Sequence, residues 1–488
     1  MACRSTGAAV ASSFVGVVIL GLAGCAASPF DSALYSSRPT DSAHAMMPIA
    51  ADAPESIYRT SQAPSASESI EPTLNAYIEY ALFHSPEVER SYQDWRASSE
   101  RLPQVRSLPD PRLKLGFFVN EVETRVGAQQ AKVGIEQSFP WIGTLKSRED
   151  SAARGALVAW YRFQNAQLLV AEQVSMSMYE LAYLDQAIEI THENEMLLRS
   201  IEEVVRAKYR VGTGSHPELI RIQIELAEIN NRLIGLEAWR PAQIANLNSA
   251  LNRPPQTHIP EGFVIPQLRI VDSAATLAGI AKENNPLLQA AAQQIERSRI
   301  ETELAHKDGY PNLSVGLEYI ATDDASNSAI AESGDDPVML TFGISLPIWR
   351  EKYDAGVRES IAKRLSVSRN HDAQGNTIDA RIYKAWFEHT DADRRVMLYE
   401  DSLLPKAQEL LSASLGGIRA GSLDYLDMLD TQQTLLELSI SAQRARADRG
   451  KALATINRLV GIAVQTRDTS LETHSSAQTK NNLSEAKP

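Results

Sequence analysis

The side chains with the clearest capacity for chemistry are two carboxylates in the last quarter of the chain, Asp427 and Asp430. A spacing of three residues places both on one face of a helix. Neighbouring carboxylates attract cations, so one interpretation is a site that attracts cations. The other is the solvated face of a surface helix, and the spacing alone allows both.

No arrangement of residues forms an enzymatic motif. His192-Glu-Asn-Glu195 lacks the second histidine of a zinc-protease motif. Gly212-Thr-Gly214-Ser lacks both the glycine spacing and the preceding strand of a phosphate loop, and no G-x-S-x-G elbow occurs. We therefore expect a protein that is not an enzyme and needs no cofactor.

Thioether side chains are a further candidate, because soft sulfur ligands suit Cu(I) and Ag(I). Met176, Met178 and Met196 lie in a segment with a helical pattern. Met176 and Met178 point to different faces of such a helix, and methionine in helices is more often packing filler. We therefore predict no metal site.

The composition is that of an ordinary folded protein with an acidic balance. The chain has 488 residues, 43% of them hydrophobic and 22% charged, and a formal net charge of -13. A nucleic-acid-binding surface needs a basic stripe, so we expect no nucleic-acid partner. Cys3 and Cys25 are the two cysteines, which excludes a disulfide framework or a Cys-based zinc site downstream.

The first 25 residues indicate export and lipid attachment. An apolar run is followed by Leu22-Ala-Gly-Cys25, and small residues directly before a cysteine resemble a bacterial lipobox. The pattern predicts a lipoprotein signal peptide, 1–24, whose removal leaves Cys25 as an acylated N-terminus carrying palmitate. Ala26 after the cysteine implies the outer membrane. The alternative is an ordinary signal peptide with an incidental cysteine.

Polar segments border the folded part of the chain. Residues 25–71 are rich in Ser, Ala, Pro and Thr, cannot bury a core, and predict a flexible lipid-anchored linker. Residues 462–488 predict a polar C-terminal tail. No other stretch offers about 18 uncharged apolar residues, so any membrane crossing by the mature chain requires strands.

The chain between these segments is a duplication. Residues 111–116 match 311–316 at an offset of 200, and Arg210-Val-Gly212 matches Arg419-Ala-Gly421 at an offset of 209. Internal repeats of this kind decide the architecture. The predicted divisions are a first repeat, 72–252, an equatorial linker, 253–273, and a second repeat, 274–461.

Each repeat contains two segments in which apolar and polar residues alternate. Such alternation over about ten residues indicates a strand with one apolar and one polar face, of a length that suits a tilted crossing of a bilayer. Each pair ends near a tryptophan, Trp141 or Trp349, as in an interfacial belt. A soluble sandwich shows the same alternation. The predicted strands are 111–120, 131–140, 311–320 and 338–347.

Long helices follow the strands. Lys146 to Tyr209 contain no proline and one glycine, which predicts about 95 Å of helix. Residues 351–404 repeat this pattern, weakened around 370–376. Apolar residues from Leu219 to Leu236 step by three and four, as in a heptad seam. Helices of this length suit a coiled-coil wall.

Four strands are too few for a closed barrel. An open edge is not tolerated in lipid, and single-chain bacterial barrels begin at about eight strands. Several copies must therefore contribute four strands each. Because an eight-stranded barrel is filled by its own side chains, a conducting pore favours three copies or more.

The lipobox, the duplication, the strand pairs, Phe139-Pro-Trp-Ile-Gly143 and the glycine turns at 212 and 421 together resemble the TolC family of outer-membrane efflux proteins. The resemblance covers 72–461. It implies an α+β membrane protein that forms a homotrimer, with four transmembrane β-strands per chain completing a twelve-stranded barrel. A long α-helical coiled-coil tunnel would continue the barrel into the periplasm.

The same resemblance assigns roles to particular residues. The helix-to-helix turns at 210–215 and 419–422 would contact a periplasmic adaptor protein, although their glycines could also be helix caps alone. Glu218, Asp427 and Asp430 would form the periplasmic gate and its cation-selective rings. Leu423 and Ile418 replace the basic and tyrosine partners that close this gate in the family. The turn residues are Arg210, Val211, Gly212, Thr213, Arg419, Ala420, Gly421 and Ser422.

The function implied is that of a passive exit duct. Substrate would pass from a periplasmic adaptor and an inner-membrane pump of the resistance–nodulation–division (RND) type to the exterior. The lipobox and the Pro-Trp-Ile-Gly sequence are most similar to heavy-metal efflux members, with multidrug efflux as the alternative. A structural coiled-coil outer-membrane lipoprotein is a third hypothesis, which predicts continuous heptads and no alternating strands.

Overall fold

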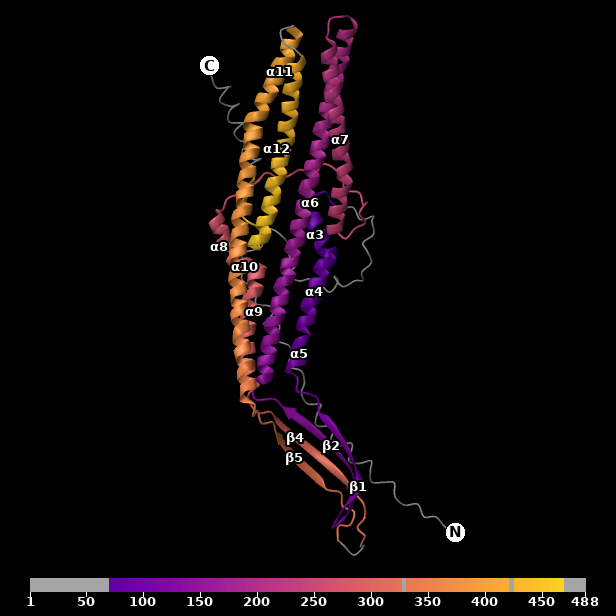
Figure 1. The fold of residues 1–488 in the computed structure, drawn as a ribbon, viewed down its shortest axis with the longest axis vertical. Coiled ribbons are helices and arrows are strands. Elements are labelled where there is room, and N and C mark those ends of the chain that lie inside the picture. Colours follow the sequence, from indigo (N-terminus) through magenta and orange to yellow (C-terminus); the bar gives the residue numbers. More distant parts are fainter. Residues whose placement is uncertain (1–69, 327–330, 421–424, 469–488) are drawn as a thin grey trace, which may run out of the picture. The chain divides into compact units, whose positions relative to one another are not determined.

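The computed structural model describes residues 70–326, 331–420 and 425–468. The first repeat begins with three short helices, continues through a strand pair and ends in two long helices (Figure 1). In order these are α3 (Leu74–His84), α4 (Pro86–Ser99), α5 (Arg101–Arg106), β1 (Arg112–Thr124), β2 (Gly127–Phe139), α6 (Thr144–Arg210) and α7 (His216–Ala250).

The second repeat, flanked by two short strands, has two helices before its strand pair instead of three, and its long helix is divided by a π-helix. The elements in order are β3 (Leu268–Ile270), α8 (Ala274–Asn284), α9 (Pro286–Lys307), β4 (Leu313–Thr322), β5 (Val338–Ile344), α10 (Arg350–Leu398), a π-helix (Tyr399–Leu403), α11 (Leu404–Ala420), α12 (Tyr425–Val460) and β6 (Thr466–Asp468).

Several elements differ from those predicted. Strand β1 ends at Thr124 rather than 120, and β5 ends at Ile344 rather than 347. Helix α10 continues without a break through 370–376, so the predicted weakening there is wrong. The polar residues of this stretch cost a few tenths of a kcal/mol each, roughly, which a helix of 49 residues absorbs. Strand β2 begins at Gly127 rather than 131, because its first residues pair with β1 without showing alternation.

Proline and an extended residue before it start the second helix of each repeat. Ser85 precedes Pro86 at the start of α4, and Asn285 precedes Pro286 at the start of α9. The Asn285 side chain accepts hydrogen bonds from the N–H groups of Leu287 and Leu288, at 2.9 and 3.2 Å. Proline suits the first helical position because no partner is needed there for its missing N–H.

The four long strands form one antiparallel sheet in the order β1-β2-β4-β5. The second strand of the first repeat pairs with the first strand of the second repeat, with Ile135 opposite Leu317. Strands β1 and β5 are the two edges of this sheet. The sheet lies at one end of α6, and the turn between α6 and α7 lies at the other (Figure 1).

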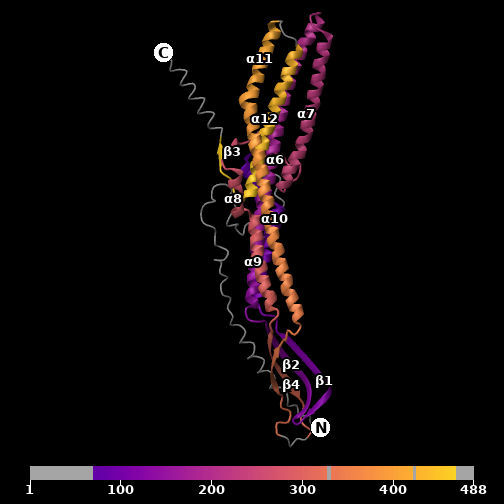
Figure 2. The same cartoon turned by 60° about the vertical axis from the view of Figure 1, so that its left-hand side comes forward.

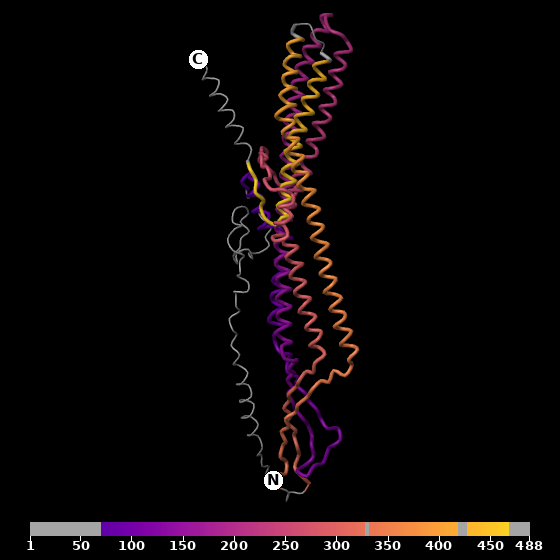
Figure 3. The backbone as a smooth tube through the Cα atoms, turned by 90° about the vertical axis from the view of Figure 1, so that its left-hand side faces the viewer, coloured from indigo at the N-terminus to yellow at the C-terminus, as the bar shows by residue number. Residues whose placement is uncertain are grey.

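Helix α6 packs against helices of both repeats. Its 67 residues include buried side chains from Thr144 to Val205, and it contacts α3, α4, α5, α7, α9 and α12. Figure 3 shows α6, α9 and α10 running beside one another. A helix of this length spans about 100 Å, so it fixes the distance between the sheet and the turn that follows Arg210.

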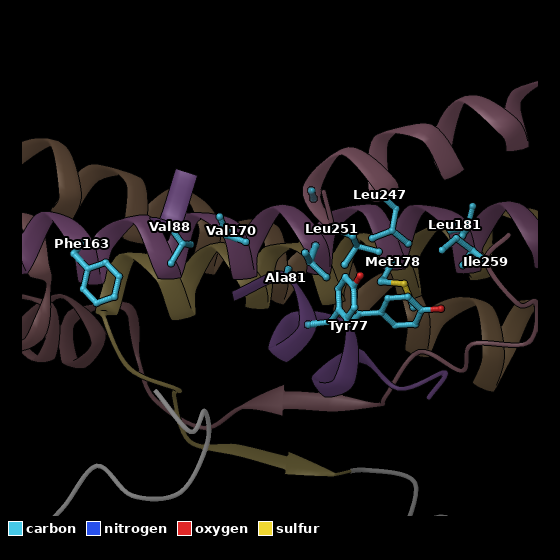
Figure 4. Close-up of a cluster of buried hydrophobic side chains, with 13 residues drawn as sticks. Tyr77, Ala81, Val88, Phe163, Val170, Met178, Leu181, Leu247, Leu251 and Ile259 are labelled. Carbon is cyan, nitrogen blue, oxygen red and sulfur yellow. The ribbon is translucent and has the colours of Figure 1, made fainter. Parts of the chain in front are cut away.

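Three apolar clusters hold the helices together. One joins the start of the first repeat to α6 and the end of α7, with Tyr77, Met178, Leu247 and Ile259 at its centre (Figure 4). The second joins α8, α10 and α12, and the third joins α6, α7 and α12 near the hairpin turns. Strands β3 and β6 form a separate two-stranded sheet beside α8 (Figure 2).

Candidate functional site

The sheet has one face made almost entirely of large apolar side chains. Cross-strand registers place Leu113, Ile135, Leu317 and Leu340 in one row. These four side chains lie on the surface of the chain. Further along β1, the side chain of Phe117 is 79% exposed and that of Val119 is 97% exposed. A contiguous apolar face of this kind is unfavourable in water and is the surface that a strand presents to lipid.

The opposite face of the same sheet is polar. Lys114, Lys132, Glu136 and Glu318 alternate there with glycines. Lys114 forms an ion pair with Glu136 across the β1–β2 pair. The alternation predicted from the sequence therefore becomes a two-faced sheet.

Aromatic side chains lie where the strands meet the helices. Trp141 stacks on Tyr310 with 5.0 Å between ring centroids, and its backbone N–H donates to Asn312 Oδ1 at 3.1 Å. Trp349, before α10, is exposed. Tryptophan at the end of a transmembrane strand belongs to the interfacial level of a bilayer.

The turn after α6 is built on a left-handed glycine. Gly212 has φ of 77°, and the N–H groups of Thr213 and Gly214 bond the Lys208 carbonyl at 3.0 and 3.2 Å. A positive φ reverses the chain at little cost only in glycine. Arg210, Val211 and Thr213 are exposed around this turn, so its outer surface is available to another molecule.

Glu218 lies in the cap of the next helix. Its N–H donates to Ser215 Oγ, and its carboxylate accepts from the Ser215 N–H at 3.3 Å, which forms a capping box. The half-buried Glu218 is thereby held within its own chain. This cap needs no neighbouring helix.

Asp427 and Asp430 are exposed on α12, on either side of the buried Met428 and Leu429. Met428 and Leu429 belong to the apolar cluster shared with α6 and α7. Among the residues whose side chains the structure describes, no cation lies within ion-pair distance of Asp427 or Asp430. The backbone of Arg419 and Ala420 is helical, whereas Gly421, Ser422 and the predicted lipidation residue Cys25 lie outside the described part of the chain.

Among the ion pairs between helices that were not predicted from the sequence, two involve arginines at equivalent positions of the repeats. In the first repeat, Arg240 Nε lies 2.7 Å from Asp185 Oδ1, and Arg240 also contacts Glu261 at 3.4 Å. Burial raises the pKa of the Asp185 carboxyl, and the hydrogen bond from Arg240 opposes this rise.

The second repeat contains the counterpart of this pair. Arg449 Nη1 lies 2.9 Å from Asp393 Oδ1, which Arg269 Nε also contacts at 3.0 Å. Arg240 and Arg449 occupy equivalent positions at the offset of 209 residues. The repeated arginine could have indicated from the sequence that both positions have a structural role. The sequence does not reveal which acidic residue each arginine pairs with.

His389 lies beside the second pair. The Ile270 N–H donates to its Nε2 at 3.3 Å, so its Nδ1 carries the proton and donates to the Arg449 carbonyl at 3.2 Å. Burial, the largest influence, lowers the pKa of His389. A neutral imidazole therefore joins β3 to α10 and α12.

Two other features are absent from the described ranges. Among these residues, no three His, Cys, Asp or Glu side chains gather as a metal ion would require. Within the same ranges, none of the helices has a window apolar enough to cross a membrane.

Comparison with known proteins gives matches over most of the chain. The profile of the outer membrane efflux protein family matches twice, at residues 77–253 and 277–462. The cobalt-zinc-cadmium resistance protein CzcC of Cupriavidus metallidurans is 23% identical over 405 residues, which are 80% of this chain and 90% of that protein.

Solved structures share the fold at low sequence identity. The outer membrane protein VceC of Vibrio cholerae superposes with a TM-score of 0.66 at 16% identity, over 80% of this chain and 97% of that one. CusC, described as forming a transmembrane channel, gives 0.69 at 14% identity, over 86% and 99%. With a family match in both repeats, the chain belongs to the outer membrane efflux protein family.

Proposed function

We propose that three copies of this chain form the outer-membrane channel of a tripartite efflux pump. The observation that carries the proposal is the two-faced sheet with free edges at β1 and β5. An open edge in lipid leaves backbone groups unsatisfied, and pairing β5 of one copy with β1 of the next removes both edges. Three sheets would then make a twelve-stranded barrel with its apolar face toward lipid.

The helices supply a second reason for assembly. The structure describes the whole first half of α10, from Arg350 to Thr377, and none of these residues is buried within the single chain. This half of α10 packs against α9 with half-buried side chains only, and most helix stability in proteins comes from tertiary contacts. The corresponding faces of neighbouring copies would cover it and complete a tunnel.

The channel would act as a passive conduit rather than an enzyme. An inner-membrane RND pump would supply the energy, and a periplasmic adaptor would meet the turns at 210–215 and 419–422. The exposed side chains of Arg210, Val211 and Thr213 support this contact.

A pair of glycine variants tests this role of the turn. Gly212→Val places a branched side chain at φ of 77° and should abolish efflux in cells. The control Gly235→Ala lies in α7 with open space around the added Cβ, and should retain it. Equal efflux by both variants would contradict the role of this turn.

We propose heavy-metal cations as the substrate, with the exposed Asp427 and Asp430 at the tunnel entrance. The support is the named relative in cobalt, zinc and cadmium resistance and the attraction of carboxylates for cations. Deleting the gene should lower the concentrations of Co²⁺, Zn²⁺ and Cd²⁺ that stop growth, and complementation should restore them. Unchanged metal tolerance with lowered drug tolerance would contradict this assignment and favour multidrug efflux.

We also propose that Cys25 carries the lipid. The supporting observation is the Leu22-Ala-Gly-Cys25 sequence. Cells grown with labelled palmitate should label the wild-type chain and fail to label Cys25→Ala. Labelling of the variant would place the lipid elsewhere.

A further inference from the structure

The polar face of the sheet combines long charged side chains with glycines in cross-strand register. Gly134 on β2 lies opposite Lys114 on β1 and Glu318 on β4. Gly116 lies opposite Lys132. Each of these charged residues therefore has a neighbour with no side chain.

The charged side chains fold down over these glycines. A Cβ atom placed on Gly134 would lie 2.7 Å from Glu318 Cγ, and one on Gly116 would lie 3.0 Å from Lys132 Cγ and Cε. Gly134 is buried although it lies on a surface of the sheet, because the side chain of its neighbour covers it. The charged side chains thus run along the wall rather than straight out from it.

The charges along this face are mixed. Three basic residues, Arg112, Lys114 and Lys132, occur with two acidic residues, Glu136 and Glu318. Glu136 is the acceptor in the ion pair with Lys114, and its side chain is 21% exposed. Opposite charges this close largely cancel at distances beyond about 10 Å in physiological salt.

We propose that a mixed-charge belt lines the part of the pore that the strands enclose, and that it keeps this part wide and weakly selective between cations and anions. The belt consists of Lys114, Lys132, Glu136 and Glu318, with the side chains of Lys132 and Glu318 lying over Gly116 and Gly134. This inference rests on the proposed channel function, in which the polar face lines the pore. The belt admits hydrated ions and polar solutes of either sign.

Single-channel recording of the full-length oligomer in planar bilayers tests both parts of this inference. Glu136→Gln with Glu318→Gln keeps side-chain size and leaves the belt basic, so the ratio of potassium to chloride permeability should fall several-fold. Gly134→Leu displaces Glu318 from the wall and should reduce conductance. Gly116→Ala, a smaller change beneath a flexible lysine, should reduce conductance less.

The control is Ile135→Val, which lies between Gly134 and Glu136 but on the apolar face; it should change neither property. The inference is overturned if the wild-type channel conducts and the double glutamine variant keeps its permeability ratio, or if both glycine variants assemble with unaltered conductance. Failure of the proposed function is distinguishable, because the wild-type protein itself would then not conduct. If Gly134→Leu does not assemble, the inference is tested by the permeability ratio of the double glutamine variant and by the conductance of Gly116→Ala.

Discussion

The two long helices that follow the strand pairs show how differently the duplicated halves are used. Helix α6 buries side chains from Thr144 to Val205, whereas α10 buries none before Ile378. The first repeat thus supplies the scaffold on which the chain folds. The second repeat leaves half of its long helix for a surface beyond the single chain, which is why assembly and folding should be closely coupled here.

The helices also differ in continuity. Helix α6 is unbroken, but the second repeat has a π-helix over Tyr399–Leu403, directly before Pro405. The Leu404 N–H bonds the Tyr399 carbonyl, five residues back, and Pro405 has no N–H to offer. At the offset of 209 residues, Met196 occupies the position of Pro405, so one proline accounts for the difference.

The hairpin turns differ in charge. At the same offset, Glu218 and Arg221 of the first repeat correspond to Asp427 and Asp430 of the second. Glu218 is held in a capping box, and Arg221 lies 3.7 Å from Glu225. Among the side chains that the structure describes, Asp427 and Asp430 have no ion-pair partner, so a charge preference would arise at the hairpin of the second repeat.

The largest expected effect comes from the buried ion pair of the second repeat. Asp393→Asn leaves Arg449, which is 2% exposed, and Arg269 without their anion. Removing one partner of a buried pair costs about 3–5 kcal/mol in the free energy of unfolding. Denaturant unfolding followed by circular dichroism measures this loss.

The matched variant in the first repeat is Asp185→Asn. Its effect should be smaller, because Arg240 is more exposed than Arg449 and keeps Glu261 as a partner. Equal losses at both sites would show that the two pairs are equivalent after all.

A proline exchange tests the difference in helix continuity. Met196 is exposed, so Met196→Pro removes little packing but breaks the hydrogen-bond ladder of α6, at a cost of about 3 kcal/mol. The control Met196→Ala should be near neutral. The reverse change, Pro405→Met, should not destabilise. A stable Met196→Pro protein would refute the scaffold role of α6.

The charge difference between the hairpins predicts a functional change. Asp427→Asn with Asp430→Asn should lower the ratio of potassium to chloride permeability several-fold, because the carboxylates attract cations at the tunnel entrance. Reversal potentials in a salt gradient measure this ratio, with Glu437→Gln, further along the same helix, as the control. Unchanged reversal potentials in the double variant would place Asp427 and Asp430 away from the ion path.

The smallest expected effect is a pH dependence from His389, which faces the charged groups of Arg449, Asp393 and Arg269. Because its pKa is lowered in the fold, the unfolded chain takes up the proton first as pH falls below about 6.5. Stability is therefore full above that pH and declines as pH falls toward the lowered value. His389→Gln should flatten this part of the stability–pH curve; an unchanged slope would assign the dependence to other groups.

The sequence predicts local and repeated features well, but it predicts contacts between distant residues of the same chain poorly. Alternation predicts the two faces of β4 and β5, and the offsets of 200 and 209 predict the paired repeats. The acidic partners of Arg240 and Arg449 depend on how α7 packs on α6 and how α12 packs on α10, which no local pattern encodes. The seating of Glu318 on Gly134 likewise depends on the register between β2 and β4, so a glycine in the strand gave no indication of its role.

The most direct test of the account is the conductance of the purified full-length protein in planar bilayers, measured together with the mass of its oligomer. We expect a trimer that gives small, cation-selective single-channel currents. A monomer without conductance would contradict the channel, and a structural coiled-coil lipoprotein would then explain the long helices better.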